Sequence, residues 1–336
     1  MLFPFPVAVC DVGGTNCRIS VQDGPAEPLR PLTHLLVGDY PGLGEAIAAS
    51  TERRGIRLGS VIACGAGPVE GRRLKLTNAP WVLDGAEIAH RLGLGNGLLL
   101  NDFEAQALSL PALKPGWLRS IGPDIPSDGD TRVILGPGTG LGVAALIEAG
   151  GRFVPLSSEG GHMGFGPEAE EDYPVWPLLE KVGGRVTGES VLAGAGLVRL
   201  HRARLAAAGA PSAPGVTAAE ITGTALEAPD GPEADTVRHY WRLVARFAGD
   251  VAITLKATGG VTLAGGILPR IVDLLDEDAF RAAFERKAPV ADLARRIPTR
   301  LIVQADSVLG GMAALATEPD RYALDYAARG WKGERA

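Results

Sequence analysis

The chain has 336 residues, of which 46% are hydrophobic and 5% aromatic, and a formal net charge of −6. This length predicts about two domains, and the composition is typical of a soluble α/β protein and not of a disordered chain. The apolar stretches are short and the start lacks the features of a signal peptide, so we expect a cytoplasmic protein without a membrane partner. The acidic balance argues against a nucleic acid partner. The three cysteines, Cys10, Cys17 and Cys64, indicate neither disulfides nor structural zinc.

The first motif joins a buried strand to a glycine-rich turn. Apolar residues 7–10 end at a carboxylate, and a second apolar run follows at residues 19–21. Glycines allow positive φ and a close approach of the backbone to a ligand, and a carboxylate at a strand end suits the water ligands of Mg²⁺. The motif therefore predicts a hairpin for an Mg²⁺-bound polyphosphate, with an ordinary glycine-rich hairpin as the alternative. The residues concerned are Asp11, which would hold the metal through water, Gly13, Gly14 and Thr15.

Short buried strands alternate with helices through the rest of the first half. We expect helices over residues 43–54 and 84–92, and strands over residues 61–63, 74–77 and 98–100. Residues 111–130 are rich in Pro, Gly, Asp and Ser, which favours a linker. We therefore expect domains at residues 1–110 and 111–336.

The second half repeats the opening pattern. A strand at residues 133–135 leads into a glycine-rich turn with Gly138 and Thr139, and a strand at residues 143–147 follows. We interpret this as two related halves that present phosphate-binding hairpins to a shared cleft, with chance similarity as the alternative. A third turn, with Gly265 and Gly266, follows a strand at residues 261–263 and precedes a helix. Further helices are expected over residues 187–208, from 217, over 234–258 and over 310–315, with a last strand at 301–303.

Asp102 follows an apolar strand and begins a helix. One interpretation is a helix N-cap, for which aspartate is favoured. The other is a general base in phosphoryl transfer, which needs little covalent chemistry from the protein, at a strand end where α/β sheets hold ligands.

Several polar residues have the chemistry of a sugar site, because carboxylates, amides and imidazoles match hydroxyls that both donate and accept. For any one of them alone, a solvated surface residue is the favoured interpretation, and the sugar-site hypothesis depends on the group as a whole. His162 has no second His or Cys at metal-ligand spacing. The group consists of Asn101, Asp102, Glu159, His162 and Glu189.

Other nucleotide-binding and nucleophile motifs are missing from the sequence. It has no Gly-x-Gly-x-x-Gly at the first turn, no Gly-x-x-x-x-Gly-Lys-Ser/Thr loop and no Gly-x-Ser-x-Gly elbow.

The combined motifs resemble those of bacterial glucokinases, in the hexokinase/actin-like ATPase superfamily. The resemblance is collinear over nearly the whole chain and implies two RNase H-like α/β domains flanking a cleft, the C-terminal one larger and carrying helical insertions, with a C-terminal helix that could pack back on the smaller domain. It implies transfer of the ATP γ-phosphate to the 6-hydroxyl of glucose with Mg²⁺, by a homodimer. The motifs are Asp11-Val-Gly-Gly-Thr-Asn-x-Arg18, Thr77-Asn78-x-x-Trp81, Leu100-Asn-Asp-Phe103, Leu135-Gly-Pro-Gly-Thr-Gly-Leu-Gly142, Glu159-Gly-Gly-His162, Arg185-Val-x-x-Glu189 and Leu263-Ala-Gly-Gly-Ile267.

The resemblance also implies a role for each matching residue. Asp102 matches the catalytic base. The substrate-binding positions match Asn78, Asn101, Glu159, His162 and Glu189. The first phosphate motif matches Asp11, Gly13, Gly14 and Thr15, the second Gly138 and Thr139, and the adenosine motif Gly265 and Gly266.

The sequence departs from related families at two points. Gly164 stands where the family often has Asp, which bears on sugar selectivity. The Cys/His zinc cluster of the repressor/open-reading-frame/kinase family and an N-terminal helix-turn-helix are both missing, which argues against a sugar-sensing repressor. The alternatives are a kinase for mannose, fructose or an N-acetylhexosamine, and a catalytically idle sugar-binding regulator.

Overall fold

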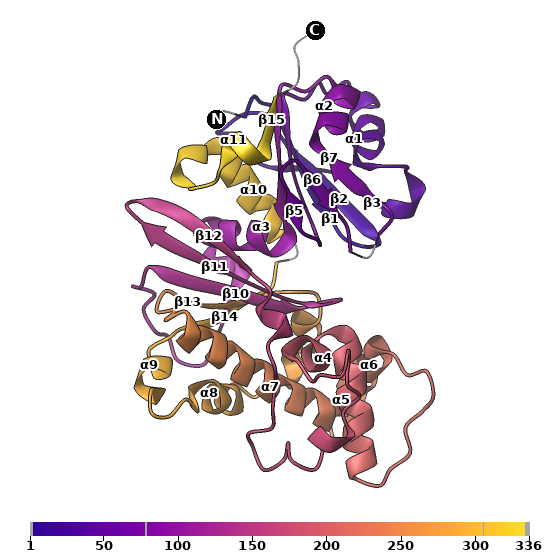
Figure 1. Cartoon of the computed structure of the whole chain (residues 1–336), viewed down its shortest axis with the longest axis vertical. Coiled ribbons are helices and arrows are strands. Elements are labelled where there is room, and N and C mark those ends of the chain that lie inside the picture. The colour runs from indigo at the N-terminus through magenta and orange to yellow at the C-terminus, as the bar shows by residue number, and fades with distance from the viewer. Residues whose placement is uncertain (1–2, 78, 305, 333–336) are drawn as a thin grey trace. The chain divides into compact units, whose positions relative to one another are not determined.

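The computed structural model describes residues 3–77, 79–304 and 306–332. The chain divides into two compact units, drawn in Figure 1 with their elements labelled. The domain boundary expected between residues 110 and 111 stays a prediction. Unit 1 comprises Met1–Trp117, Leu146–Ser157 and Gln304–Ala336, and unit 2 comprises Leu118–Ala145 and Ser158–Val303.

A six-stranded sheet forms the centre of unit 1, in the order β15-β8-β4-β1-β2-β3. The adjacent strands β1, β4 and β8 are parallel, whereas β2, β3 and β15 pair antiparallel with their neighbours. Parallel strands covered on both faces are apolar throughout, which explains why their sequences were readable as buried strands. The strands are β1 (Val7–Val12), β2 (Asn16–Gln22), β3 (Arg30–Leu36), β4 (Ser60–Gly65), β8 (Asn96–Asn101) and β15 (Gly330–Lys332).

Helices and a small second sheet complete unit 1. Asp84 caps α2 by accepting from the amides of Ala86 and Glu87, at the start of the helix expected over residues 84–92. Gly93 ends this helix in the left-handed conformation, with φ 62°. Helix α10 packs against α3 and contacts β1. These elements are α1 (Leu43–Glu52), α2 (Gly85–Leu92), α3 (Asp102–Ser109), α10 (Ser307–Thr317), α11 (Tyr326–Arg329), β5 (Val69–Glu70), β6 (Arg73–Lys75) and β7 (Val82–Asp84).

The second six-stranded sheet has the order β12-β11-β10-β13-β14-β9. Strands β10, β13 and β14 are parallel, and β9 is antiparallel to β14. Residues Leu146–Ser157 of β11 and β12 are counted with unit 1. The strands are β9 (Leu118–Ile121), β10 (Thr131–Pro137), β11 (Leu141–Ala149), β12 (Arg152–Ser158), β13 (Gly260–Leu263) and β14 (Thr299–Ile302).

Five helices described in unit 2 pack around the long helix α7, whose buried residues include Tyr240, Trp241 and Phe247. Helices α5, α6 and α8 contact α7, and α7 contacts β10 and β13 (Figure 1). The apolar face of α7, the helix expected over residues 234–258, therefore lies in the core of this unit. The helices are α4 (Gly188–Leu192), α5 (Gly194–Ala207), α6 (Ala218–Glu227), α7 (Pro232–Thr254), α8 (Glu277–Glu285) and α9 (Ala291–Arg295). Short 3₁₀ helices span Val37–Asp39, Leu110–Ala112, Pro115–Trp117, Gly160–His162, Trp176–Leu178, Leu268–Leu274 and Pro319–Arg321.

The two sheets repeat one strand order. In each, the first three strands of the series (β1, β2, β3 and β10, β11, β12) lie side by side, and the next two (β4, β8 and β13, β14) extend the sheet from the first. This repeat supports the interpretation of two related halves.

The helix expected over residues 187–208 is a pair of helices, α4 and α5. Ala193 is extended between them, with φ −76° and ψ 174°. The amide of Gly194 donates to the carbonyl of Gly138 at 2.9 Å and so leaves the helical hydrogen-bond series. A tertiary contact thus ends α4 where local propensity would continue it.

Three other expectations need correction. The linker at residues 111–130 contains β9, a four-residue edge strand with a single fully buried residue, Ile121, too little to give a sequence signal. The helix expected after Gly266 is a 3₁₀ helix, Leu268–Leu274, which carries a proline in its first turn. Helix α7 ends at Thr254, and the nearby Lys256 takes a positive φ of 47°.

Candidate functional site

The carboxyl ends of β1, β4 and β8 bring the predicted acidic residues of unit 1 to one edge of its sheet. Asp11 lies in register with Cys64, and Cys64 with Leu100. Asp102 comes directly after β8. Both carboxylates therefore lie at the edge where α/β sheets hold ligands.

The carboxylate of Asp11 is held by two partners. Arg18, directly opposite on β2, donates Nη2 to its Oδ2, and the Cys64 thiol donates to its Oδ1 at 3.5 Å. Arg18 also donates Nη1 to Asp306 at 2.9 Å. The Asp11 side chain is 19% exposed, and carboxylate oxygens are the ligands that Mg²⁺ prefers, often with waters kept between. Asp11 therefore fits a water-mediated contact to the metal.

Asn101, not Asp102, caps helix α3. The side-chain oxygen of Asn101 accepts from the amides of Phe103 at 3.0 Å and Glu104 at 3.2 Å, and its Nδ2 donates to the carbonyl of Gly67 at 3.0 Å. The N-cap interpretation of Asp102 is therefore wrong: Asp102 occupies the first helical position, where its Oδ1 accepts from the amide of Phe103 at 2.9 Å. The side chain of Asn101 also hydrogen-bonds the Asp102 carboxylate, which lowers the pKa of Asp102, so this amide links the helix cap to the proposed base.

An ion pair fixes the start of α3 from the far end of the chain. Glu104 is 5% exposed, and its two oxygens pair with Arg329 at 2.6 and 2.7 Å. Its carboxylate also accepts from the amide of Asn101 at 3.4 Å, which closes a capping box. The capping box and the ion pair with Arg329 therefore fix the helix terminus that carries Asp102.

The pKa of Asp102 is raised to about 6. Burial is the largest cause, the hydrogen bond from the amide of Phe103 opposes it, and the negative charge of Asp11 adds to the rise. A carboxylate with a pKa close to neutral is well matched to accept a proton from a hydroxyl.

The first glycine-rich turn closes with a hydrogen bond from the amide of Gly13 to the carbonyl of Asn16 at 2.8 Å. Gly14 and Thr15 are exposed. Neither glycine has a positive φ, so what they contribute is uncovered backbone and not the left-handed conformation. Asn78 lies outside the described residues.

The second and third turns lie against each other in unit 2. The amide of Gly138 donates to the carbonyl of Gly140 at 2.8 Å, and Thr139 is exposed. Gly265 has φ 87°, and a Cβ there would lie 2.3 Å from the carbonyl oxygen of Pro137. Only glycine fits this approach, while a Cβ at Gly266 would meet nothing within 4 Å. The structure thus brings Gly138, Thr139, Gly265 and Gly266 into one region.

Three of the predicted sugar residues cluster in unit 2. His162 lies between two carboxylates, with Nε2 3.6 Å from Glu159 Oε2 and Nδ1 3.8 Å from Glu189 Oε1. The other oxygen of Glu189 accepts from the amide of Leu141 at 2.9 Å. The side chains of Glu159 and His162 are 92% and 54% exposed. The cluster is accessible and combines donors with acceptors, as recognition of a polyol requires.

Close backbone packing holds this cluster together. A Cβ at Gly161 would lie 2.1 Å from the carbonyl oxygen of Leu141, and one at Gly188 would lie 2.6 Å from the Phe247 ring. Gly164 differs, because a Cβ there would have only Arg185 Nη2 at 4.0 Å. The glycine that departs from the family pattern is therefore not required by packing.

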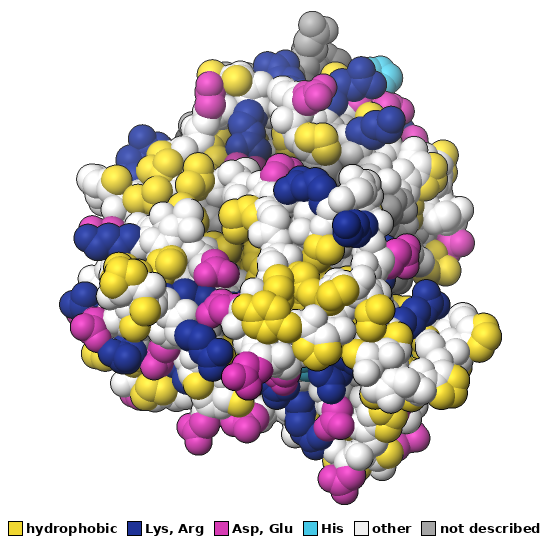
Figure 2. Space-filling model, turned by 60° about the horizontal axis from the view of Figure 1, so that its bottom comes forward, with side chains coloured by type: hydrophobic (Ala, Val, Ile, Leu, Met, Phe, Trp, Pro, Cys, Tyr) yellow, Lys and Arg dark blue, Asp and Glu magenta, His cyan; other side chains and the backbone are white. Residues whose placement is uncertain are grey.

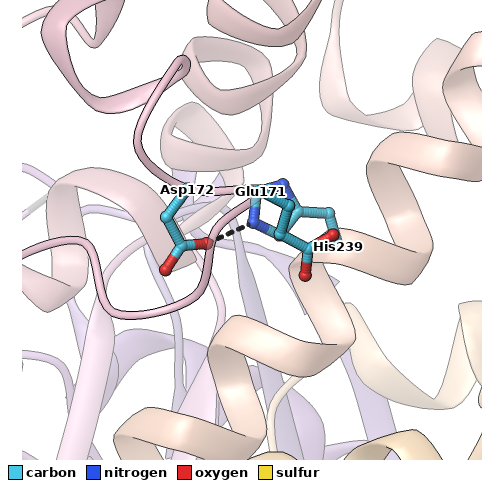
Figure 3. A group of neighbouring side chains, drawn as sticks. All are labelled: Glu171, Asp172 and His239. Carbon is cyan, nitrogen blue, oxygen red and sulfur yellow. Dashed lines mark hydrogen bonds and ion pairs between the residues drawn. The ribbon is translucent and has the colours of Figure 1, made fainter.

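Glu171, Asp172 and His239 place three ligand atoms within 4.8 Å of one another (Figure 3). His239 Nδ1 accepts from Arg204 at 2.8 Å, since arginine can only donate, and its Nε2–H donates to Asp172 at 2.8 Å. Glu171 is bound by Arg242 at 2.6 and 2.5 Å. Both ring nitrogens of His239 are hydrogen-bonded, and the carboxylates of Glu171 and Asp172 are paired with arginines. This group is therefore an ion-pair network and not a metal site.

A cavity of about 220 Å³ opens beside that network, between α7 and α8. Its described lining combines three acids and three arginines with an apolar floor of alanines and Leu243, and includes none of the predicted site residues. The face drawn in Figure 2 likewise intersperses acidic and basic side chains. Among the described residues, no helix combines the length and apolarity needed to cross a bilayer.

Several residues that shape the site could not be predicted from the sequence. Asp306 and Arg329 lie more than 200 residues from their partners, Arg18 and Glu104. Only the spacing of Asn101 and Glu104 carried a signal, that of a capping box.

Comparison with known proteins identifies the family. The family model described as Glucokinase matches residues 8–319. A glucokinase of Mesorhizobium japonicum is 42% identical over 98% of this chain and 96% of its own length. The crystal structure of a glucokinase from an Antarctic psychrotroph superposes with a TM-score of 0.80 and 27% identity, covering 93% of this chain and 99% of that one.

A more distant structure, a ROK family glucokinase from Streptomyces griseus in complex with glucose and AMPPNP, has a TM-score of 0.62 and 21% identity, over 93% of this chain and 99% of that one, and shows the fold alone. The expected actin-like ATPase fold is confirmed by these likenesses. The family model matches most of the chain, and a curated glucokinase is 42% identical over 98% of it, so the chain belongs to the glucokinase family.

Proposed function

We propose that this protein transfers the γ-phosphoryl group of ATP to the 6-hydroxyl of glucose, with Asp102 as the general base. Membership of the glucokinase family supports the reaction. The role of Asp102 is supported by its place at the carboxyl end of β8, beside Asp11 on the same sheet edge, and by its pKa of about 6. The S. griseus neighbour, which shares the fold, holds glucose and AMPPNP.

The proposal gives each group of residues one task. In unit 1, Asp102 accepts the proton of the attacking hydroxyl in line with the transferred phosphorus, and Asn101 donates to the sugar. In unit 2, Glu159, His162 and Glu189 bind further sugar hydroxyls, which fixes the orientation of the nucleophile. Asn78 is proposed as a further substrate contact on the strength of its motif.

The phosphates of ATP are assigned to the glycine-rich turns. Gly13, Gly14 and Thr15 offer amides and a hydroxyl in unit 1, and Gly138 and Thr139 do so in unit 2, with Gly265 and Gly266 at the adenosine. Asp11 would hold Mg²⁺ through water, and the bound metal would neutralise charge on the phosphate oxygens. Phosphoryl transfer then needs positioning and charge stabilisation more than covalent catalysis.

Sugar-dependent ADP release from purified protein with Mg²⁺-ATP tests the proposal. We expect turnover with glucose to exceed that with mannose, fructose and N-acetylglucosamine. Preference for another sugar would contradict the glucose assignment, and sugar binding without turnover would contradict catalysis and favour a regulator. The homodimer expected from the family is tested separately by light scattering of the purified protein.

A further inference from the structure

The segment that follows His162 is tied to helix α7 by one arginine. Arg246 donates Nη2 to the carbonyl of Gly166 at 2.6 Å and Nη1 to Asp172 at 2.6 Å. Its guanidinium carbon lies 4.0 Å from the centre of the Phe165 ring, within cation–π range. A single buried side chain thus grips a backbone carbonyl, a carboxylate and an aromatic ring of the same loop.

Asp172 makes this grip rigid. It is 1% exposed and accepts from the amides of Glu168 and Ala169 at 2.9 and 3.0 Å, besides Arg246 and His239. Burial alone would raise the pKa of Asp172, but the hydrogen bond from His239, the two amides and the charge of Arg246 outweigh it and lower the pKa to about 2. The carboxylate is therefore ionised and fully bonded at neutral pH.

The gripped segment is continuous with the sugar cluster. The carbonyl of His162 accepts from Arg185 at 3.3 Å, and the carbonyl of Met163 accepts from the amide of Gly188 at 3.0 Å. The amide of Phe165 donates to Val186 at 3.1 Å, and its carbonyl accepts from Trp176 Nε1 at 3.0 Å. Hydrogen bonds therefore hold most backbone groups of residues 162–166, and Arg246 supplies the one at the carbonyl of Gly166.

Arginine is the side chain that this geometry requires. Its planar fork binds two acceptors at once while stacking on a ring, whereas the ammonium of lysine is a single point charge. Arg242, one turn earlier on α7, pairs with Glu171 on the same loop but does so at the surface, with 32% of its side chain exposed. Arg242 provides a matched control, since no described contact joins it to Phe165 or Gly166.

We propose that Arg246 is a positioning residue for glucose binding, which fixes Phe165 and Gly166 and through them the backbone that presents His162. The inference rests on the proposed role of His162 in binding glucose. It assigns no contact between Arg246 and the sugar.

The first test compares Arg246→Lys with Arg242→Lys. We expect Arg246→Lys to raise the glucose KM about tenfold, because small displacements of binding groups are expensive in affinity, while the ATP KM changes less than about twofold. Arg242→Lys should leave both constants within about twofold of the parent, as for an exposed ion pair. Thermal unfolding midpoints define a temperature at which all variants are folded. An unchanged glucose KM in folded Arg246→Lys would overturn the inference.

A double-mutant cycle with His162→Gln shows whether Arg246 acts through the histidine. We expect the two effects on glucose KM to be strongly non-additive, with Arg246→Lys adding less than about twofold once His162 is replaced. Effects that multiply would overturn the positioning role while leaving glucose binding by His162 intact. A normal glucose KM in His162→Gln would instead overturn the assigned sugar site and the inference with it.

Trp176→Phe provides a test that leaves the buried charges in place. It removes the Nε1–H donor to the Phe165 carbonyl while keeping an aromatic ring. A rise of about threefold in glucose KM with the ATP KM unchanged would support positioning through this backbone. Equal changes in both KM values, or no change in either, would overturn the inference. This test remains valid even if Arg246→Lys fails to fold.

Discussion

The two glycine-rich turns that open the two sheets differ in charge. In unit 1 the turn follows Asp11, whose carboxylate is held by Arg18 and the Cys64 thiol. In unit 2 the residue at the matching position, counting back from Thr139 as from Thr15, is Leu135, which is fully buried in the core. One strand order therefore supports two different sites, a charged one and a neutral one.

The neutral turn uses backbone where the charged turn uses side chains. The carbonyl of Gly138 accepts from Gly194, the first residue of α5, so the positive end of that helix lies beside the turn. The charged turn places the carboxylate of Asp11 at the same sheet edge as Asp102, the residue that we propose as the base. Under the proposed function, proton transfer and metal binding would belong to unit 1, and the second turn would bind phosphate without a carboxylate, through its amides and the Thr139 hydroxyl.

The largest expected effect follows from removing the base. Asp102→Asn keeps the shape of the side chain but cannot accept the hydroxyl proton, so kcat should fall by about a hundred- to ten-thousand-fold. Coupled detection of ADP measures the loss, and an unchanged unfolding midpoint would confirm that the fold is intact. A near-normal kcat would contradict the role of Asp102 as the base, and with it the proposed functional difference between the two turns.

The same substitution should stabilise the protein at neutral pH. The pKa of Asp102 is about 6 in the folded chain and 3.8 in an ordinary setting, so the folded state binds the proton more tightly, and stability falls as pH rises from about 4 to 6. The full shift corresponds to about 3 kcal/mol, which partial exposure reduces to about 1–2 kcal/mol. The stability that Asp102→Asn gains over the parent should therefore be about 1–2 kcal/mol larger at pH 7 than at pH 4. Guanidinium unfolding of both proteins at the two pH values measures this difference. An equal difference at both pH values would contradict the raised pKa.

A smaller effect tests the neutral turn. A Cβ at Gly138 would meet nothing within 4 Å, so Gly138→Ala should fold normally. Its methyl group would hold phosphate oxygens away from the turn amides and raise the ATP KM about tenfold. Gly116→Ala, also in open space, should leave the ATP KM unchanged. If Gly138→Ala behaves like this control, the second turn does not bind phosphate.

The smallest expected effect concerns sugar selectivity in unit 2. Gly164→Asp has room and can pair with Arg185. The added acceptor near His162 should shift the ratio of kcat/KM for glucose over mannose by about threefold, with stability unchanged. Parallel assays with both sugars measure it, and an unaltered ratio would exclude position 164 from sugar recognition.

The sequence predicted the parts of the fold that depend on local pattern. Apolar runs identified the parallel strands, and capping residues such as Asp84 and Thr217 marked where helices begin. The edge strands β9 and β15 escaped prediction because their pattern is short and only partly apolar. The break at Ala193 escaped it because a contact with Gly138, more than 50 residues earlier, ends the helix.

The sequence motifs predicted the residues of the candidate site, but not the residues that hold them in position. Glu159, His162 and Glu189 come together as their chemistry suggested. The assignment of the α3 cap to Asn101, the pairing of Glu104 with Arg329 and the grip of Arg246 on Gly166 depend on long-range geometry. No spacing along one sequence reports such contacts.

The pH dependence of kcat/KM for glucose tests the role of Asp102 most directly. The parent protein should show an activity that rises with pH through an apparent pKa of about 6, because the base must be ionised to accept the proton. In Asp102→Asn the residual activity should lose this ascending limb. A profile that is flat from about pH 4.5 to 8, or the same limb in the variant, would contradict Asp102 as the base.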